Sequence, residues 1–275
     1  MRGRRKAVFS RSLFAAIALS LILAAPARPQ DRQSTLAARE AKAQELRITL
    51  YHYYEKPTDT GRLLMDLDET GWGRLEFVLG FLAGVFAKYP EAIEVAKGTK
   101  LGRETQSAVF HSLRLADRYS DAIAAARQWG WPLDQMTRVE MVTPLHQLKV
   151  EHRSTLDGLL GASLATGDEA YVRQIYDYYD GVVSAGDIDV RDIVATALLK
   201  PRSDKDAIEA LKRKYSTEAL KRLNLASWAL VMLEGQAREH KFVAAALDRY
   251  AKEKLGSPTN EGFAQLRSAI AAKGR

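Results

Sequence analysis

The chain has 275 residues, a formal net charge of +7 at pH 7 and no cysteine. The lack of cysteine excludes disulfide bonds, thiolate metal sites, a cysteine nucleophile and a lipid-bearing cysteine after a signal peptide. No motif in the sequence discloses a reaction.

The first 27 residues predict a secretory signal peptide. They begin with basic residues, continue with an apolar stretch from Leu13 to Ala25 and end in small residues at Ala25 and Ala27. The apolar stretch is shorter than the roughly 20 residues that cross a bilayer, so we expect cleavage after Ala27 and no integral membrane segment in the mature chain. Arg4 and Arg5 lack the hydrophobic pair of a twin-arginine signal, which favours general secretion and a periplasmic or secreted protein.

The signal segment accounts for most of the positive charge. It carries five of the 41 basic residues and no acidic residue, which leaves 36 basic against 34 acidic residues and a charge of about +2 on the mature chain. Nucleic-acid-binding proteins usually carry a marked basic excess or a basic face. We therefore expect no nucleic-acid partner.

The mature chain has helical periodicity almost throughout, with apolar residues three and four positions apart. Residues 28–34 are expected to be a flexible leader, and Ser34 is expected to cap a helix that ends near Glu55. The stretch from Phe77 to Phe86 is apolar on most sides, which predicts a central core helix. Further helices are predicted at 59–70, 74–89, 90–98, 103–118 and, capped by Ser120, up to 129.

The helical pattern is interrupted between residues 130 and 153. Residues 146–152, HQLKVEH, alternate apolar or aromatic with polar side chains, which is the two-residue period of an extended chain. We expect a linker, a strand-like arm or a boundary between two subdomains there. Helices then resume at a capping box, Ser154 to Asp157, and after a turn at 167–168. They are predicted at 154–166, 168–181, 190–200, 204–215, 217–234, 237–255 and 259–273.

About a dozen short helices with brief connections predict an all-α fold. Stacked helix pairs would form an irregular α-solenoid or helical array over residues 35–275. Three segments each combine a helix of small residues, a tight polar turn and a second amphipathic helix, but their spacing is uneven. No fixed period such as the 34-residue tetratricopeptide unit is therefore expected.

Three segments carry a resemblance to known proteins. They are LLGASLATGDEAYVRQI (159–175), KPTDTGRLL followed by GFLAGVFAKYP (56–90), and ASWALVMLEGQAREHKFV (226–243). They resemble a family of exported bacterial α-helical proteins of unknown function, broadly tetratricopeptide-like. The resemblance covers most of the mature chain without residues 130–153. It implies a helical-repeat fold and export, and it carries no catalytic residue.

A tyrosine pattern occurs twice, as YHYYE at 51–55 and as YDYYD at 176–180. Helical spacing predicts that each motif places at least two rings in the core and leaves one at its boundary. Each motif is also expected to end a helix just before a breaker, Pro57 or Gly181. Packing is the simpler interpretation, and a contact surface for a peptide is the alternative, because tyrosine supplies contact area at low entropic cost.

Other candidate sites are less specific. Trp129 and Trp131 form an aromatic cluster outside a clear helical stripe. His146 and His152, with Glu151 between them, lack the spacing of a known metal motif, and we interpret them as surface or packing residues. His111 and His240 are single histidines on helices. We expect no metal and no cofactor.

These observations predict a non-enzymatic interaction module of the bacterial cell envelope that binds a protein or peptide partner. The candidate partner-binding residues are Tyr53, Tyr178, Trp129 and Trp131. The first alternative is an envelope hydrolase in which carboxylates or the two histidines His146 and His152 line a groove. The second is a purely structural scaffold.

Overall fold

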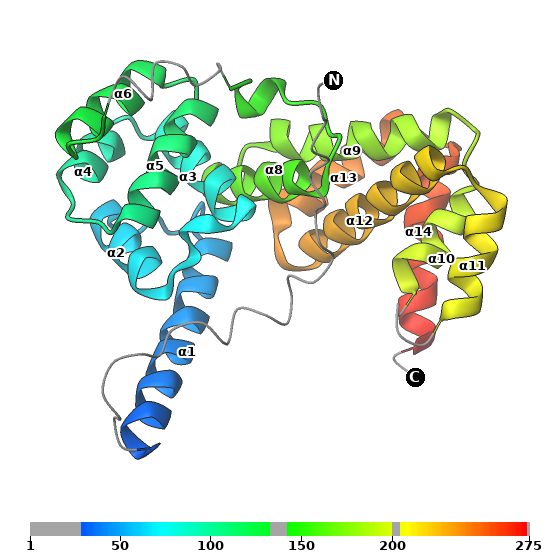
Figure 1. Ribbon diagram of the computed structural model, residues 1–275. Coiled ribbons are helices and arrows are strands. Elements are labelled where there is room, and N and C mark those ends of the chain that lie inside the picture. The colour runs from blue at the N-terminus through cyan, green and yellow to red at the C-terminus, as the bar shows by residue number, and fades with distance from the viewer. Residues whose placement is uncertain (1–28, 133–141, 200–203, 274–275) are drawn as a thin grey trace, which may run out of the picture. The chain divides into compact units, whose positions relative to one another are not determined.

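The computed structural model describes residues 29–132, 142–199 and 204–273. Within these ranges the chain forms thirteen α-helices, two short 3-10 helices and no strand, which confirms the all-α array (Figure 1). The α-helices of the first half are α1 Pro29–Tyr51, α2 Thr60–Thr70, α3 Glu76–Lys88, α4 Glu91–Gly98, α5 Arg103–Leu115 and α6 Tyr119–Gln128. Those of the second half are α8 Arg153–Thr166, α9 Glu169–Ser184, α10 Val190–Leu198, α11 Lys205–Lys214, α12 Thr217–Glu239, α13 Lys241–Glu253 and α14 Pro258–Lys273.

The chain divides into two units, residues 1–41 and 42–275. The described part of the first unit is the beginning of α1. All contacts discussed below lie within the second unit. A search of the described residues finds no helix long and apolar enough to span a membrane.

Helices α3 and α8 make the most extensive contact between described helices. A Cβ atom on Gly80 of α3 would lie 2.0 Å from the carbonyl oxygen of Gly158 on α8, and a Cβ on Gly161 would lie 2.1 Å from that of Phe77. A real Cβ atom cannot lie so close to an oxygen atom. Only glycine, which has no Cβ, therefore allows the two backbones to approach this closely. Phe81 on α3 is fully buried, which confirms the prediction of a central core helix.

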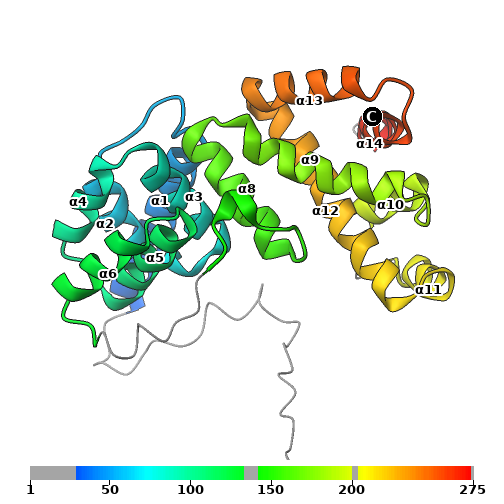
Figure 2. The same cartoon turned by 90° about the horizontal axis from the view of Figure 1, so that it is seen from above.

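Two clusters of buried side chains form the core of unit 42–275. One is built mainly from the end of α1 and from α2 to α6, and the other mainly from α8 to α14. In Figures 1 and 2, α2, α4, α5 and α6 lie to one side of α8, and α10, α11, α12 and α14 lie to the other. The small-residue contact between α3 and α8 joins the two clusters.

The predicted boundary at 130–153 is only partly described. Residues 133–141 lie outside the described ranges. The remainder contains a 3-10 helix at Leu145–Gln147, and Leu148 and His152 have extended backbone angles. The described part of this segment forms no strand but has extended backbone at these two residues, and a linker, a strand-like arm and a boundary between two subdomains all stay predictions.

Several helix ends agree with the sequence signals. Asp59 accepts a hydrogen bond from Arg62 N at 2.8 Å and caps α2, and Gly71 ends that helix with a left-handed φ of 72°. Gly167 ends α8 with a φ of 68°, and Asp168 then caps α9 by accepting from Ala170 N at 2.9 Å. Local capping chemistry decides these ends, because the aspartates accept from free amide groups at a helix start and the glycine amides donate to free carbonyl groups at a helix end.

Other predicted helix ends are wrong. Helix α1 begins at Pro29 and ends at Tyr51, so the first tyrosine motif lies mostly in a turn. Helix α9 continues through Gly181 to Ser184, so the second motif does not end its helix. Helix α12 continues past residue 234 to Glu239, and His240 forms the joint with α13. Tertiary packing overrides local propensity at these points.

Two predicted caps are also wrong. Helix α8 begins at Arg153, and the Asp157 carboxylate accepts from Trp228 on α12 instead of closing a capping box with Ser154. Helix α6 begins at Tyr119, one residue before the predicted cap Ser120. In each case the helix starts earlier than the capping residue indicated.

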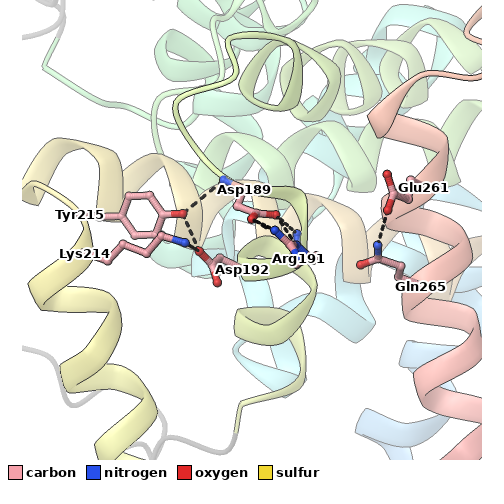
Figure 3. A network of polar contacts seen from close by, with 7 residues as sticks. All are labelled: Asp189, Arg191, Asp192, Lys214, Tyr215, Glu261 and Gln265. Atoms are coloured by element: carbon pink, nitrogen blue, oxygen red, sulfur yellow. Dashed lines mark hydrogen bonds and ion pairs between the residues drawn. The ribbon is translucent and has the colours of Figure 1, made fainter.

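A polar network fixes the start of α10 to the end of α11 (Figure 3). Asp189 caps α10 by accepting from Arg191 N at 2.9 Å, and it also pairs with the Arg191 guanidinium at 2.7 Å. The Tyr215 hydroxyl donates to Asp192 Oδ2 at 2.6 Å and accepts from Asp189 N at 3.2 Å. Lys214 Nζ donates to Asp192 at 2.5 Å. Each member has a partner within the network, which indicates a structural joint.

Candidate functional site

The first tyrosine motif places its central ring in the core. Tyr53 lies in the turn after α1, is 2% exposed and packs edge-on against Phe81 with ring centroids 5.1 Å apart. Burial raises the pKa of its phenol. The location does not support the partner-binding role predicted for Tyr53, because almost none of the side chain reaches the surface.

The second motif divides between core and surface. Tyr176 and Tyr179 on α9 are 1% and 0% exposed, which confirms the predicted buried stripe. Tyr178 is partly exposed, and burial of the rest of the ring raises its pKa to about 12. Of the two predicted tyrosines, Tyr178 is the one that reaches the surface.

Tyr178 lines a groove with a cavity volume of about 800 Å³. The groove lies between α9, the first half of α12 and the segment that leads into α8. We call it the Tyr178 groove. Its lining residues are Val150, Glu151, His152, Arg153, Tyr178, Glu218, Lys221, Arg222, Asn224, Leu225 and Trp228. The volume falls within the range of about 300–1,000 Å³ that is typical of ligand pockets.

The floor and rim of the groove differ in chemistry. Aromatic and apolar side chains such as Trp228 and Leu225 are partly buried, whereas the charged residues are mostly exposed. Lys221 Nζ lies 3.0 Å from Glu218 Oε2, and Arg222 pairs with Asp187. Exposed pairs of this kind contribute little to stability, so they can exchange partners at low cost when a ligand binds.

Trp228 is held by charged neighbours on α8. The Arg153 guanidinium lies 3.5 Å from the centroid of the Trp228 ring, and Trp228 Nε1 donates to Asp157 Oδ1 at 3.4 Å. Burial is the main cause that raises the pKa of Asp157. These contacts fix the indole ring at the groove before any ligand arrives, which lowers the entropic cost of binding.

The predicted tryptophans lie elsewhere. Trp129 and Trp131 have ring centroids 5.7 Å apart and pack against the cluster of α1 to α6. Trp131 donates from Nε1 to Gln106 at 3.1 Å and lines a smaller cavity of about 490 Å³ with His111. The structure therefore does not bring these tryptophans together with Tyr178.

The histidines lie in different parts of the structure. His152 lines the Tyr178 groove, while His146 is exposed in the 3-10 helix, and its backbone carbonyl accepts from Gln174. His240 is 0% exposed, and with His52 and Glu55 it forms the one group of described residues whose side chains could hold a metal ion. Sequence spacing gave no sign of this group, because His240 is separated from His52 and Glu55 by most of the chain.

Sequence reasoning also missed the α12 wall of the groove. Lys221, Leu225 and Trp228 occur at helical spacing and so share one face of α12. That face resembles an ordinary amphipathic stripe, and only packing against α8 and α9 turns it into one side of a groove.

Comparisons of the chain with protein-family models, with curated proteins and with solved structures found no match. No family is therefore identified, and the tetratricopeptide-like resemblance stays a prediction.

Proposed function

We propose that the chain is an exported helical interaction module that binds a peptide segment of a protein partner in the Tyr178 groove. The observation that carries the proposal is the groove itself: about 800 Å³, with Tyr178 and Trp228 placed at one partly open surface. Aromatic side chains of this kind dominate the energetics of many protein interfaces.

The lining indicates the chemistry of the peptide. Tyr178, Leu225 and Trp228 provide an apolar surface for one aliphatic or aromatic anchor residue. Lys221 and Arg222 lie at the rim, where a carboxylate next to the anchor can replace Glu218 or Asp187 as a partner. We therefore propose a peptide with an apolar anchor flanked by an acidic residue.

A groove hydrolase has weaker support. His152 and Glu151 line the groove, as that alternative requires, but the His152 ring makes no hydrogen bond with another described residue. General-base catalysis needs such a base within hydrogen-bond reach of a nucleophile or water, held by an orienting group. A contact surface needs no such arrangement.

Export places the proposed partner in the cell envelope. The sequence of residues 1–27 supports this part of the proposal through its basic start, apolar stretch and small residues before Arg28. The compartment and the partner class are thus proposed together.

A peptide library selected on the folded chain tests the groove directly. Peptides recovered on the wild type are measured for affinity to the Asn224→Glu variant, in which an exposed groove residue is replaced by a bulkier and negatively charged one that repels a peptide carboxylate. We expect recovered peptides to contain an apolar residue beside a carboxylate and to bind the variant at least about tenfold more weakly, a loss of about 1.4 kcal/mol.

The matched control is Tyr119→Ala, which removes an exposed tyrosine on α6 outside the groove. It should leave peptide affinity unchanged. Peptides that bind wild type and Asn224→Glu equally would contradict the groove proposal, and failure to recover any peptide would favour the scaffold. Cleavage of recovered peptides, read by mass spectrometry, would favour the hydrolase.

A further inference from the structure

His240 is a buried histidine whose two ring nitrogens have no hydrogen-bond partner among the described residues. Its side chain is 0% exposed, at the joint between α12 and α13. Buried polar groups almost always have a hydrogen-bond partner. Two buried ring nitrogens without one therefore call for a physical explanation. A bound metal ion would account for one of the two nitrogens, because neutral imidazole is a common metal ligand through its unprotonated nitrogen.

Two further ligand side chains face His240 from the turn after α1. Atoms of His52, Glu55 and His240 that could bind a metal all lie within 4.8 Å of one another. His52 Nδ1 and Glu55 Oε2 are already 3.2 Å apart. Ligand atoms around a tetrahedral zinc ion lie about 3.3 Å apart, given metal–ligand distances of about 2.0–2.1 Å. Two of the three ligands therefore have the required spacing.

A small movement of the His52 and Glu55 side chains would bring all three ligands around one metal ion. His52 and Glu55 lie in a turn outside the helices, and their side chains are about half exposed, at 47% and 49%. The turn is held close to α8, since Tyr54 N donates to the carbonyl oxygen of Leu164 at 3.1 Å. The two exposed side chains can therefore close on the buried ring while the backbone stays in place.

Aromatic neighbours provide an outer shell. The His240 ring lies among His52, Tyr51, Tyr54 and Phe242, with ring centroids between 5.5 and 6.2 Å away. Tyr54 also donates from its hydroxyl to Glu55 Oε1 at 2.7 Å. Outer-shell hydrogen bonds of this kind orient a carboxylate ligand and tune metal affinity.

We propose that His52, Glu55 and His240 bind one divalent transition-metal ion, of which Zn²⁺ fits best. Two imidazoles and one carboxylate leave a fourth tetrahedral position for water. Ca²⁺ and Mg²⁺ prefer all-oxygen sites and do not suit two imidazoles. The ion would fix the turn after α1 to the joint between α12 and α13, and this site is independent of the Tyr178 groove.

Zn²⁺ titration of the metal-free full chain tests the proposal. We expect one equivalent of Zn²⁺ per chain and a rise in Tm, because a ligand that binds the folded state stabilises it. His52→Ala and Glu55→Gln each remove an exposed ligand and should weaken binding by at least about tenfold, and Tyr54→Phe should weaken it by about tenfold through loss of the outer-shell hydrogen bond.

Two further variants separate a ligand from a packing residue. His240→Phe keeps an aromatic ring against Phe242 but removes both nitrogens, so it should abolish Zn²⁺ binding while helicity is retained. His146→Ala removes an exposed histidine elsewhere and should have no effect. The proposal is overturned if the wild type binds no Zn²⁺, or if a helical His52→Ala/Glu55→Gln double variant binds it as tightly as the wild type.

Discussion

At the scale of single residues, tyrosine hydroxyl groups with and without a hydrogen-bond partner differ in what they contribute to stability. The Tyr179 hydroxyl is buried and has no hydrogen-bond partner among the described residues, whereas the Tyr215 hydroxyl is fully engaged with Asp189 and Asp192. An unpaired buried polar group costs free energy, and a paired one stabilises by about 1 kcal/mol. The hydroxyl groups of Tyr179 and Tyr215 are therefore expected to contribute unequally to stability.

Phenylalanine substitutions should reveal this difference. Tyr179→Phe removes an unpaired hydroxyl and should raise the free energy of unfolding by about 1 kcal/mol, while Tyr215→Phe should lower it by about 1 kcal/mol. Urea unfolding of both variants gives the comparison. A larger loss of stability in Tyr179→Phe than in Tyr215→Phe would contradict the unpaired state of the Tyr179 hydroxyl.

Asp189 gives a prediction about pH. Hydrogen bonds from the Arg191 side chain and backbone lower the pKa of its carboxyl from 3.8 to about 2. Because the folded pKa lies below the unfolded value, the ionised carboxylate stabilises the fold above about pH 4, and this contribution is lost as the pH falls towards 2. Asp189→Asn retains a capping side chain but not the charge.

The free energy of unfolding of Asp189→Asn should therefore lie below that of the wild type at neutral pH, and the gap should close on acidification. Urea unfolding between about pH 5 and pH 2.5 measures it. Asp206→Asn, at an exposed acidic residue on α11, serves as control. A gap that stays constant across this range would show that the charge of Asp189 contributes nothing.

At the scale of elements, the contact between α3 and α8 depends on glycine. A Cβ on Gly161 would overlap the carbonyl oxygen of Phe77, so the helices must separate to admit it. Gly235 on α12 is exposed, and a Cβ added to it would have no other atom within 4 Å. Both glycines lie inside helices, where alanine is intrinsically favoured by about 1 kcal/mol.

Alanine at these two glycines should have opposite effects. Gly161→Ala should lower the free energy of unfolding by about 3 kcal/mol through overpacking, and Gly235→Ala should raise it by up to about 1 kcal/mol. Thermal or urea unfolding distinguishes them. Equal effects of the two substitutions would mean that α3 and α8 are not in close contact.

At the scale of the whole molecule, export remains the proposal with the simplest test. If the signal peptide is cleaved after Ala27, protein recovered from the envelope of an expressing bacterium should begin at Arg28. Intact-mass measurement of that protein decides the point, and a chain with the first 27 residues still attached would contradict it. Replacing Ala27 with a bulky residue should block processing, since the cleavage site requires small side chains.

Residue patterns alone predict the all-α class, the central core helix and the helix ends that depend on local caps. Asp59, Gly71 and Asp168 act on amide and carbonyl groups of their own helices, so their effect is visible from neighbouring residues. The buried stripe of Tyr176 and Tyr179 follows in the same way from helical spacing.

The two candidate sites, by contrast, depend on tertiary packing. The joint at His240 has no local breaker, and its partners His52 and Glu55 come from the opposite end of the chain. The Tyr178 groove likewise combines α9 and α12 with the segment before α8. Both arise because helix packing brings distant side chains together, and no periodicity in the sequence specifies which helix faces will meet.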